Sequence, residues 1–306
     1  LGDTAELDLA DAAYIFDGST ENFGASVAGV GDVDGDGLDD LAISSEGWTY
    51  VLFASSLSES RYIDMGTADF KFRQHFVRYR SFVPFVASAG DVDGDGLGDI
   101  VISDSQSTEY CIYGGHFNCG ATYIILGSTI TTHDGLWFDP ADSDHIIKGT
   151  DSYQRVGWTV ASAGDVDGDG LSDIVLSSSD YAYLFLGSQL AETPSDSSAD
   201  DALNVYDASH TFTAFGTSIP AIASAGDVDA DGLDDILVGA SSYGSGQIDL
   251  FFAASLDSEA LSSGDADFQF MGDIGDGFSG KLSGVGDIDG DGHDDFLIGA
   301  EGYLSS

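Results

Sequence analysis

The segment GDVDGDGLDDLAI, from Gly31 to Ile43, recurs four more times in this chain with few changes. It returns as GDVDGDGLGDIVI from Gly90, GDVDGDGLSDIVL from Gly164, GDVDADGLDDILV from Gly226 and GDIDGDGHDDFLI from Gly286. The first aspartates of successive copies are 59, 74, 62 and 60 residues apart. A period of about 60 residues is too long for a helical hairpin and suits a four-stranded propeller blade.

Apolar runs flank each copy at similar distances. A run of small residues such as ASVAGV precedes the loop, and a run rich in Ile, Leu and Val such as DDLAIS follows it. A third run such as TYVLFAS and a weaker fourth such as ADFKF complete the repeat. These runs lack a helical period, which favours strands. We therefore predict an all-β fold, with residues 1–306 forming a single β-propeller domain and the small-residue strand innermost in each blade.

Each loop has the pattern D-x-D-x-D-G-x-x-D, which suits a hard cation. Ca²⁺ takes about six to eight oxygen ligands, and Gly at position 6 permits the sharp turn that brings carboxylates together. We expect aspartates at positions 1, 3, 5 and 9 and the backbone carbonyl of position 7 to bind it. These ligands are Asp32, Asp34, Asp36, Leu38, Asp40; Asp91, Asp93, Asp95, Leu97, Asp99; Asp165, Asp167, Asp169, Leu171, Asp173; Asp227, Asp229, Asp231, Leu233, Asp235; Asp287, Asp289, Asp291, His293 and Asp295.

The expected cofactor is therefore Ca²⁺, about five ions per chain. Mg²⁺ is less suited because it retains bound waters. A metal-free set of acidic turns is disfavoured because converging carboxylates repel one another. Ala230 replaces glycine at position 4 of the fourth loop without removing a ligand. EF-hands are excluded, since they need flanking helices and a glutamate at position 12, where the first loop has Ile43 inside an expected strand.

The charge balance limits the partners. The chain carries 54 acidic and 8 basic residues, a formal charge of −46. Such a surface repels nucleic acid and anionic membranes, so neither is an expected partner. No stretch is long and apolar enough for membrane insertion. The twenty aspartates of the loops account for less than half of the acid, and the remainder indicates a halophilic or marine surface.

The two cysteines, Cys111 and Cys119, bracket the segment CIYGGHFNC. In a secreted protein a small disulfide loop is expected. Two free thiols, or a metal site that includes His116, are the alternatives, although the spacing fits no common zinc pattern.

On these motifs the chain resembles the FG-GAP repeats of integrin α-subunits and their bacterial and archaeal relatives. The Phe-Gly element appears at Phe23-Gly24 and Phe215-Gly216, and the Gly-Ala element at Gly239-Ala240 and Gly299-Ala300. The other copies diverge at these positions. The resemblance implies a propeller with calcium in the turns between first and second strands, and seven blades are usual in the family.

Five repeats leave the blade count open. A strand-like segment, DAAYIFDG, precedes the first repeat, as if it completed the last blade of a ring, and the sequence given stops before a third strand of the fifth repeat. We expect a fragment of a longer protein with further blades or domains, and a five-bladed ring is the alternative.

A cluster of basic and aromatic residues is the candidate ligand site. Four of the eight basic residues lie in KFRQHFVRYR, which joins the first and second blades. This segment and the cysteine loop should emerge on the face opposite the calcium. Pairing of the cations with the chain's own acid is the alternative. The candidate residues are Lys71, Arg73, Arg78, Tyr79, Arg80, Tyr113 and His116.

No catalytic pattern stands out, so we expect no enzyme activity. The expected function is an extracellular or cell-surface adhesion or assembly module that binds a protein or glycan through this face. The alternative is a non-catalytic propeller within a larger secreted enzyme, such as a polysaccharide lyase or phospholipase.

Overall fold

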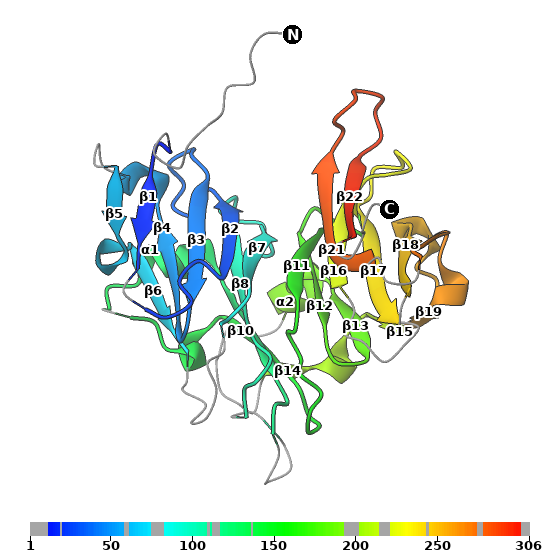
Figure 1. Ribbon diagram of the computed structural model, residues 1–306, viewed down its shortest axis with the longest axis horizontal. Coiled ribbons are helices and arrows are strands. Elements are labelled where there is room, and N and C mark those ends of the chain that lie inside the picture. Colours follow the sequence, from blue (N-terminus) through cyan, green and yellow to red (C-terminus); the bar gives the residue numbers. More distant parts are fainter. Residues whose placement is uncertain are drawn as a thin grey trace.

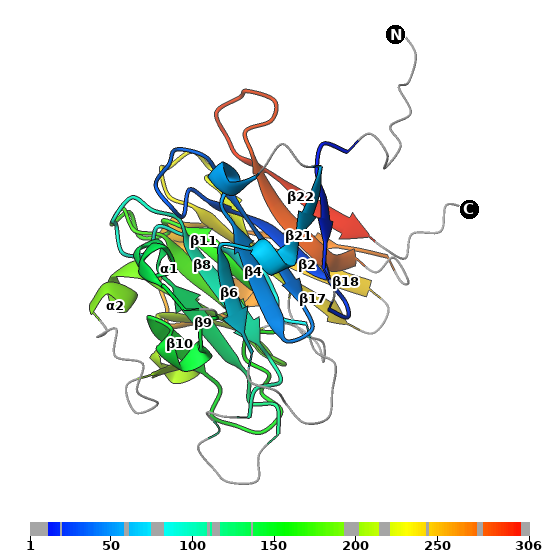
Figure 2. The same cartoon turned by 90° about the vertical axis from the view of Figure 1, so that its left-hand side faces the viewer.

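The computed structural model describes residues 12–18, 20–57, 61–74, 83–108, 111, 117–135, 137–192, 202–213, 221–242, 245–273 and 278–300. Sheets of short strands follow one another along an arc, with the first strands of successive repeats side by side (Figures 1 and 2). Within the described residues, no helix is long and apolar enough to span a bilayer. The chain is a β-propeller, as the repeat spacing predicted.

Four repeats each form a four-stranded antiparallel meander. The first is β2 (Ser26–Gly31), β3 (Asp40–Ser45), β4 (Trp48–Leu52) and β6 (Phe70–Arg73); the second is β7 (Val86–Gly90), β8 (Asp99–Asp104), β9 (Ala121–Ile125) and β10 (His145–Lys148). The third is β11 (Val160–Gly164), β12 (Asp173–Ser177), β13 (Tyr181–Phe185) and β15 (His210–Thr213). The fourth is β16 (Ala221–Gly226), β17 (Asp235–Ser242), β18 (Ser245–Phe251) and β20 (Phe268–Met271), and the fifth has the pair β21 (Phe278–Gly286) and β22 (Asp295–Ala300).

The first four repeats each add a parallel pairing at the outer edge of the preceding blade, which the sequence analysis did not predict. β14 (Leu203–Asn204) pairs in parallel with β10, and β19 (Ala260–Ser262) pairs in parallel with β15. At the corresponding place in the second repeat, Phe138 bridges to Phe72 of β6. β5 (Tyr62–Asp64) pairs in the same way with β1 (Ile15–Asp17). β1 therefore occupies the outermost-strand position of a blade that would precede the first.

Short helical turns lie between the third strand and the fourth strand of the first four repeats. Those that directly follow the third strand are η2 (Ala54–Ser56), α1 (Gly127–Thr132), α2 (Gly187–Glu192) and η6 (Ala253–Ser255). Those that precede the fourth strand are η3 (Met65–Thr67), η4 (Pro140–Asp142), η5 (Val205–Asp207) and η7 (Ser263–Asp265).

The hydrophobic core lies between blades rather than within them. One cluster joins Val51 and Phe72 of the first repeat to Ile100 and Tyr123 of the second, and similar clusters fill the next junctions. Every residue of β8 is buried, because this second strand is covered on both faces. The continuous apolar runs that follow each loop in the sequence are explained by this sandwiching.

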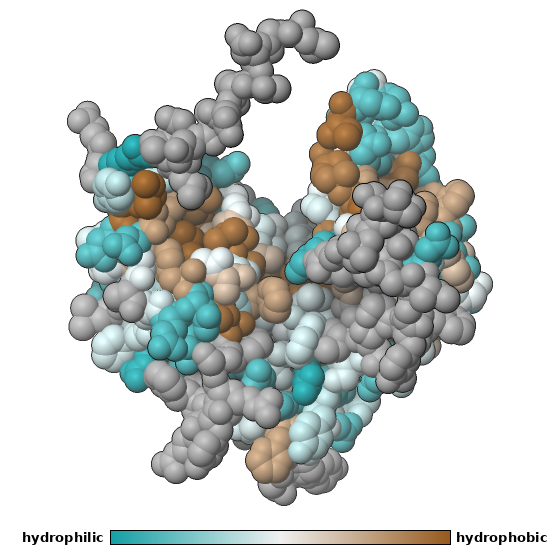
Figure 3. Space-filling view, viewed as in Figure 1, coloured by the Kyte–Doolittle hydropathy of each residue, from teal (hydrophilic) through white to brown (hydrophobic). Residues whose placement is uncertain are grey.

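The two ends of the arc lack such cover. Val27 of β2 is 66% exposed and Leu297 of β22 is 59% exposed, whereas the equivalent Val86 and Val101 of the second repeat are buried. Apolar surface faces the opening of the arc from both sides (Figure 3). β1 pairs with β5, and β21 pairs with β22, so the N-terminal strand does not complete the fifth blade in this structure.

Candidate metal loops and the opposite face

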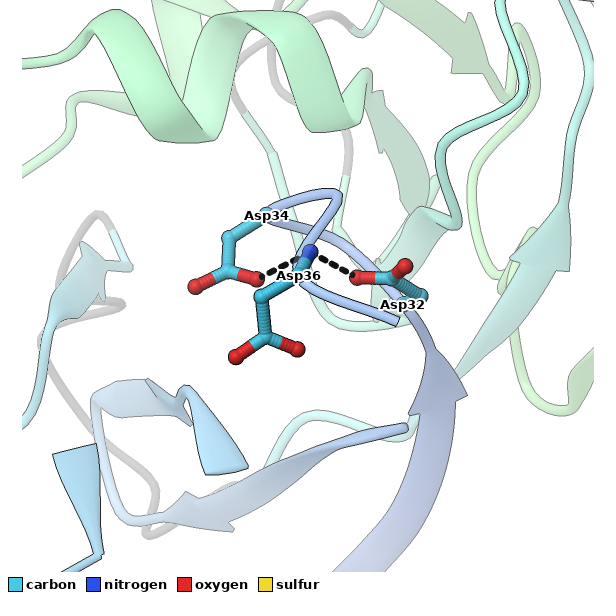
Figure 4. A group of neighbouring side chains, drawn as sticks. All are labelled: Asp32, Asp34 and Asp36. Carbon is cyan, nitrogen blue, oxygen red and sulfur yellow. Dashed lines mark hydrogen bonds between the residues drawn. The ribbon is translucent and has the colours of Figure 1, made fainter. Parts of the chain in front are cut away.

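The Asp-rich loops join the first and second strands of each repeat, at one end of every blade. In the first loop, Asp32 Oδ1 accepts a hydrogen bond from Asp36 N over 3.0 Å, and Asp32 Oδ2 accepts one from Gly37 N over 2.8 Å. Asp34 Oδ1 also accepts from Asp36 N, over 3.1 Å. Figure 4 shows the three carboxylates gathered around this turn. The aspartates thus shape the loop as well as offering oxygens to a cation.

The aspartate at position 9 is the most enclosed member of the loop. In the first four repeats it is fully buried, and each carboxylate accepts two backbone N–H groups. Asp99, for example, accepts from Val92 N within its loop and from Gly127 N at the start of α1, both over 2.8 Å. This residue therefore ties the loop to the end of the third strand.

Carboxylate oxygens converge in all five loops. In each, three aspartates place oxygens within 4.8 Å of one another. Positions 1 and 3 contribute every time; the third member is position 9 in the second to fourth loops and position 5 in the first and fifth. The groups are Asp32, Asp34, Asp36; Asp91, Asp93, Asp99; Asp165, Asp167, Asp173; Asp227, Asp229, Asp235; and Asp287, Asp289, Asp291.

The electrostatics of these groups fit a hard divalent cation. Burial raises the pKa of Asp99 and of Asp173 to about 7 each and that of Asp235 to about 6, and neighbouring carboxylates push in the same direction. Backbone N–H donors oppose the rise without cancelling it. A bound cation would stabilise the ionised forms. The donors are all oxygen, which favours Ca²⁺ or Mg²⁺ over a transition metal.

The fourth loop carries a backbone difference. Ala230 adopts φ of 61°, in the left-handed region where the other loops have glycine. A side chain costs about 1–2 kcal/mol in this conformation. The loop nevertheless keeps its hydrogen bonds from Asp231 N and Gly232 N to Asp227.

Successive loops are hydrogen-bonded to one another. At four junctions the N–H of position 8 donates to the carbonyl of position 1 in the preceding loop, over 2.8–3.1 Å: Gly98 to Asp32, Ser172 to Asp91, Asp234 to Asp165, and Asp294 to Asp227. At the last three junctions, the position 8 side chain also accepts from the position 1 N–H. Leu97 at position 7 packs against Gly35 of the loop before it. Each of the first four loops is therefore held in place by the repeat that follows it.

The basic and aromatic cluster predicted on the opposite face is described only in part. Arg78, Tyr79, Arg80, Tyr113 and His116 lie outside the described residues.

The two described members contact their own chain. Lys71 Nζ donates to the Gly66 carbonyl, and the Arg73 guanidinium lies over the rings of Trp48 and Trp137 at 5.9 and 5.6 Å. Cys111 and Cys119 are joined by a disulfide, with their Cα atoms 5.8 Å apart.

A tyrosine-lined hollow on the outer edge of the third blade was missed by the sequence analysis. It has a volume of about 680 Å³. Its walls come from segments 151–154, 178–183, 205–211 and 259–260, which share no motif. Only the unusual local number of tyrosines could have drawn attention to it.

Comparison with known proteins supports the repeat assignment. The FG-GAP repeat model matches residues 23–55 and 220–251. Integrin alpha-PS2 of Drosophila melanogaster is 28% identical over 171 residues, covering 54% of this chain and 12% of that protein. Phosphatidylinositol-glycan-specific phospholipase D of Rattus norvegicus is 34% identical over 107 residues, covering 31% of this chain and 12% of that protein. Matches to other integrin α-subunits cover up to 80% of this chain.

Among solved structures, a rhamnogalacturonan lyase aligns over 95% of this chain and 60% of its own, with 13% identity and a TM-score of 0.39. The chain spans about an eighth to a quarter of the length of these curated relatives. It contains FG-GAP repeats and is similar to integrin α-subunits.

Proposed function

We propose that this chain is an extracellular, calcium-stabilised adhesion or assembly module that binds a protein or glycan through the face opposite its metal loops. The observation that carries the proposal is the convergence of three carboxylates within 4.8 Å in each of five loops. Such groups repel one another unless a cation holds them. The module itself carries out no chemistry on its ligand.

The proposed metal is Ca²⁺, one ion per loop. Its ligands are the aspartates at positions 1, 3, 5 and 9 and the carbonyl of position 7, as expected from the sequence. The position 9 carboxylates support this assignment, because burial and neighbouring carboxylates raise their pKa values and a bound cation would stabilise their ionised forms. Five ions would reduce the formal charge from −46 to −36.

The disulfide and the proposed calcium sites support a place outside the cell. Disulfides such as that between Cys111 and Cys119 persist in oxidising compartments and are rare in the cytosol. Extracellular calcium modules bind with dissociation constants of roughly 10⁻⁴–10⁻³ M, which their surroundings saturate.

The second candidate function is a non-catalytic propeller within a larger secreted enzyme. The match to a phospholipase D favours it, since that protein is an enzyme by name and the matched part is 12% of its length. The two candidates share the metal loops and differ in what the rest of the protein does.

Metal analysis and thermal unfolding test the calcium assignment. We expect about five Ca²⁺ ions per chain, a marked fall in melting temperature in chelator, and recovery in excess Ca²⁺, because binding energy contributes to folding. Fewer than three ions per chain would contradict the loop assignment. An unchanged melting temperature in chelator would contradict a stabilising role.

The binding face is tested by changing Arg78 and Arg80 together to Ser. Partner capture by the chain should be lost while calcium content and melting temperature stay the same. The control replaces Arg61 and Lys281 with Ser, which removes the same charge elsewhere. Normal capture by the Arg78 and Arg80 variant would place the site elsewhere.

A further inference from the structure

The hollow on the third blade lies at the end of the blade away from the metal loops. The turn between β12 and β13 and the segment that leads into β11 both belong to that end, since the Asp-rich loop joins the opposite ends of β11 and β12. A volume of about 680 Å³ falls within the range of small-molecule sites, about 300–1,000 Å³.

Aromatic side chains gather around this hollow. Four of the chain's 13 tyrosines line it: Tyr153, Tyr181, Tyr183 and Tyr206. Tyr153 is 58% exposed and Tyr206 is 71% exposed, so large ring areas face solvent. Exposed aromatic rings that gather around one hollow are typical of binding sites.

Contacts within the blade hold these rings in place. The Tyr206 hydroxyl donates to Asp151 Oδ2 over 3.0 Å. The rings of Tyr181 and Tyr183 lie 6.1 Å apart, and the Tyr153 ring lies 6.3 Å from that of Phe117. The hydroxyl of the buried Tyr183 is hydrogen-bonded to Ser178 and Gln154. Rings fixed in this way lose little conformational entropy when a ligand binds.

The polar lining offers acceptors and no cation. Three carboxylates line the hollow, from Asp151, Asp180 and Glu259, and its lining includes no lysine or arginine. Among the described residues, no side chain forms an ion pair with Asp180 or Glu259. Their oxygens are open to hydroxyl donors, and their charge repels uronates, sulfates and phosphates.

We infer that this hollow binds a neutral, pyranose-based glycan. The C–H faces of a pyranose ring pack on Tyr153 and Tyr206, and its hydroxyl groups donate to the carboxylates of Asp180 and Glu259. A basic peptide is the less favoured occupant, because 54 acidic residues attract it to any part of this surface. Four of the 13 tyrosines meet at this hollow, whereas acidic residues occur along the whole chain.

The inference names a ligand class for one site and rests on the proposed role as a recognition module. It is independent of Arg78 and Arg80. The test is affinity electrophoresis and titration calorimetry of the calcium-saturated chain in 150 mM salt. The probes are dextran, galactomannan and xyloglucan as neutral glycans, polygalacturonate as an acidic one, and oligolysine as a basic peptide.

At least one neutral glycan should bind, and Tyr153→Ala and Tyr206→Ala should each weaken its binding at least tenfold. The control Tyr62→Ala removes a tyrosine of similar exposure outside the hollow and should bind normally. Calcium content and melting temperature should be unchanged in all three variants.

Three results would overturn the inference: no neutral glycan binds, the hollow variants bind as the control does, or only oligolysine binding depends on the tyrosines. If glycan binding fails while the Arg78 and Arg80 variant still loses a protein partner, this inference fails and the proposed function stands.

Discussion

Changing Asp234 to Ala in the fourth loop should weaken metal binding in the third loop. Asp234 occupies position 8, which supplies no expected ligand. Its Oδ2 accepts a hydrogen bond from Asp165 N over 2.8 Å, and Asp165 is the position 1 aspartate of the preceding loop. The alanine leaves that N–H without its acceptor, at the point where the chain enters the third loop.

The size of the effect follows from this one hydrogen bond. Removing the acceptor of a half-buried N–H costs about 1–3 kcal/mol. The N–H of residue 234 still donates to the Asp165 carbonyl, so one of the two hydrogen bonds between these residues remains in the variant. If the lost hydrogen bond destabilises only the metal-bound state, the calcium affinity of the third site falls about five- to 150-fold, at about 1.4 kcal/mol per tenfold change.

Calcium titration by calorimetry provides the assay, with Asp39→Ala as the matched control. Asp39 occupies position 8 of the first loop, is exposed, and has no preceding loop to contact among the described residues. Both variants remove one negative charge, so a general electrostatic change affects them equally. We expect one weakened site in Asp234→Ala and none in Asp39→Ala. If the two variants bind calcium alike, or if the fourth site is the one that weakens, the coupling between loops is wrong.

Three further outcomes are expected. In chelator, the melting temperature should fall as the pH rises from about 4 to 7, because the raised pKa values of Asp99 and Asp173 mean that the folded state binds more protons at these groups than the unfolded state does. Calcium binds the ionised carboxylates, so the stabilisation by calcium should increase with pH. A melting temperature in chelator that stays constant or rises over this range would contradict the prediction. Ala230→Gly should tighten calcium binding about fivefold or more by relieving the left-handed strain, and calorimetry that finds no tightening would show that the loop tolerates alanine. A thiol assay on denatured, unreduced protein should detect neither Cys111 nor Cys119, and two titratable thiols would argue against secretion.

The strand order and the loops were predictable because they follow from local patterns. The second strand of a blade, such as β8, is buried on both faces and therefore has a continuous apolar sequence. All the aspartates of one metal loop lie within nine consecutive residues. The cross-blade contacts were not predictable, because their partners lie far apart in the chain. Asp165 and Asp234 are 69 residues apart, and Phe72 meets Phe138 through a bridge between neighbouring repeats. No local pattern records such a pairing.

The position 9 aspartate shows a second reason why some contacts were not predictable from the sequence. Its spacing predicted Asp99 as a metal ligand, but not the two hydrogen bonds that it accepts from Val92 N and Gly127 N. A single residue thus serves the loop, the third strand and the candidate metal site. Its burial, and so its raised pKa, depends on packing that the sequence does not encode locally.

The described part of the fifth loop illustrates how far the metal loops rely on their neighbours. Among the described residues, its position 9 residue, Asp295, accepts an N–H from Ile288, whereas Asp99 of the second loop also accepts one from Gly127, two residues beyond the third strand. At position 1 of this loop, Asp287 is exposed, and backbone N–H donors of its own loop lower its pKa. Within this loop, Asp287 accepts hydrogen bonds from the N–H groups of Gly290, Asp291 and Gly292. The contrast separates two contributions to such a site: the Asp-rich sequence sets the turn, and the adjoining strand and the following repeat enclose it.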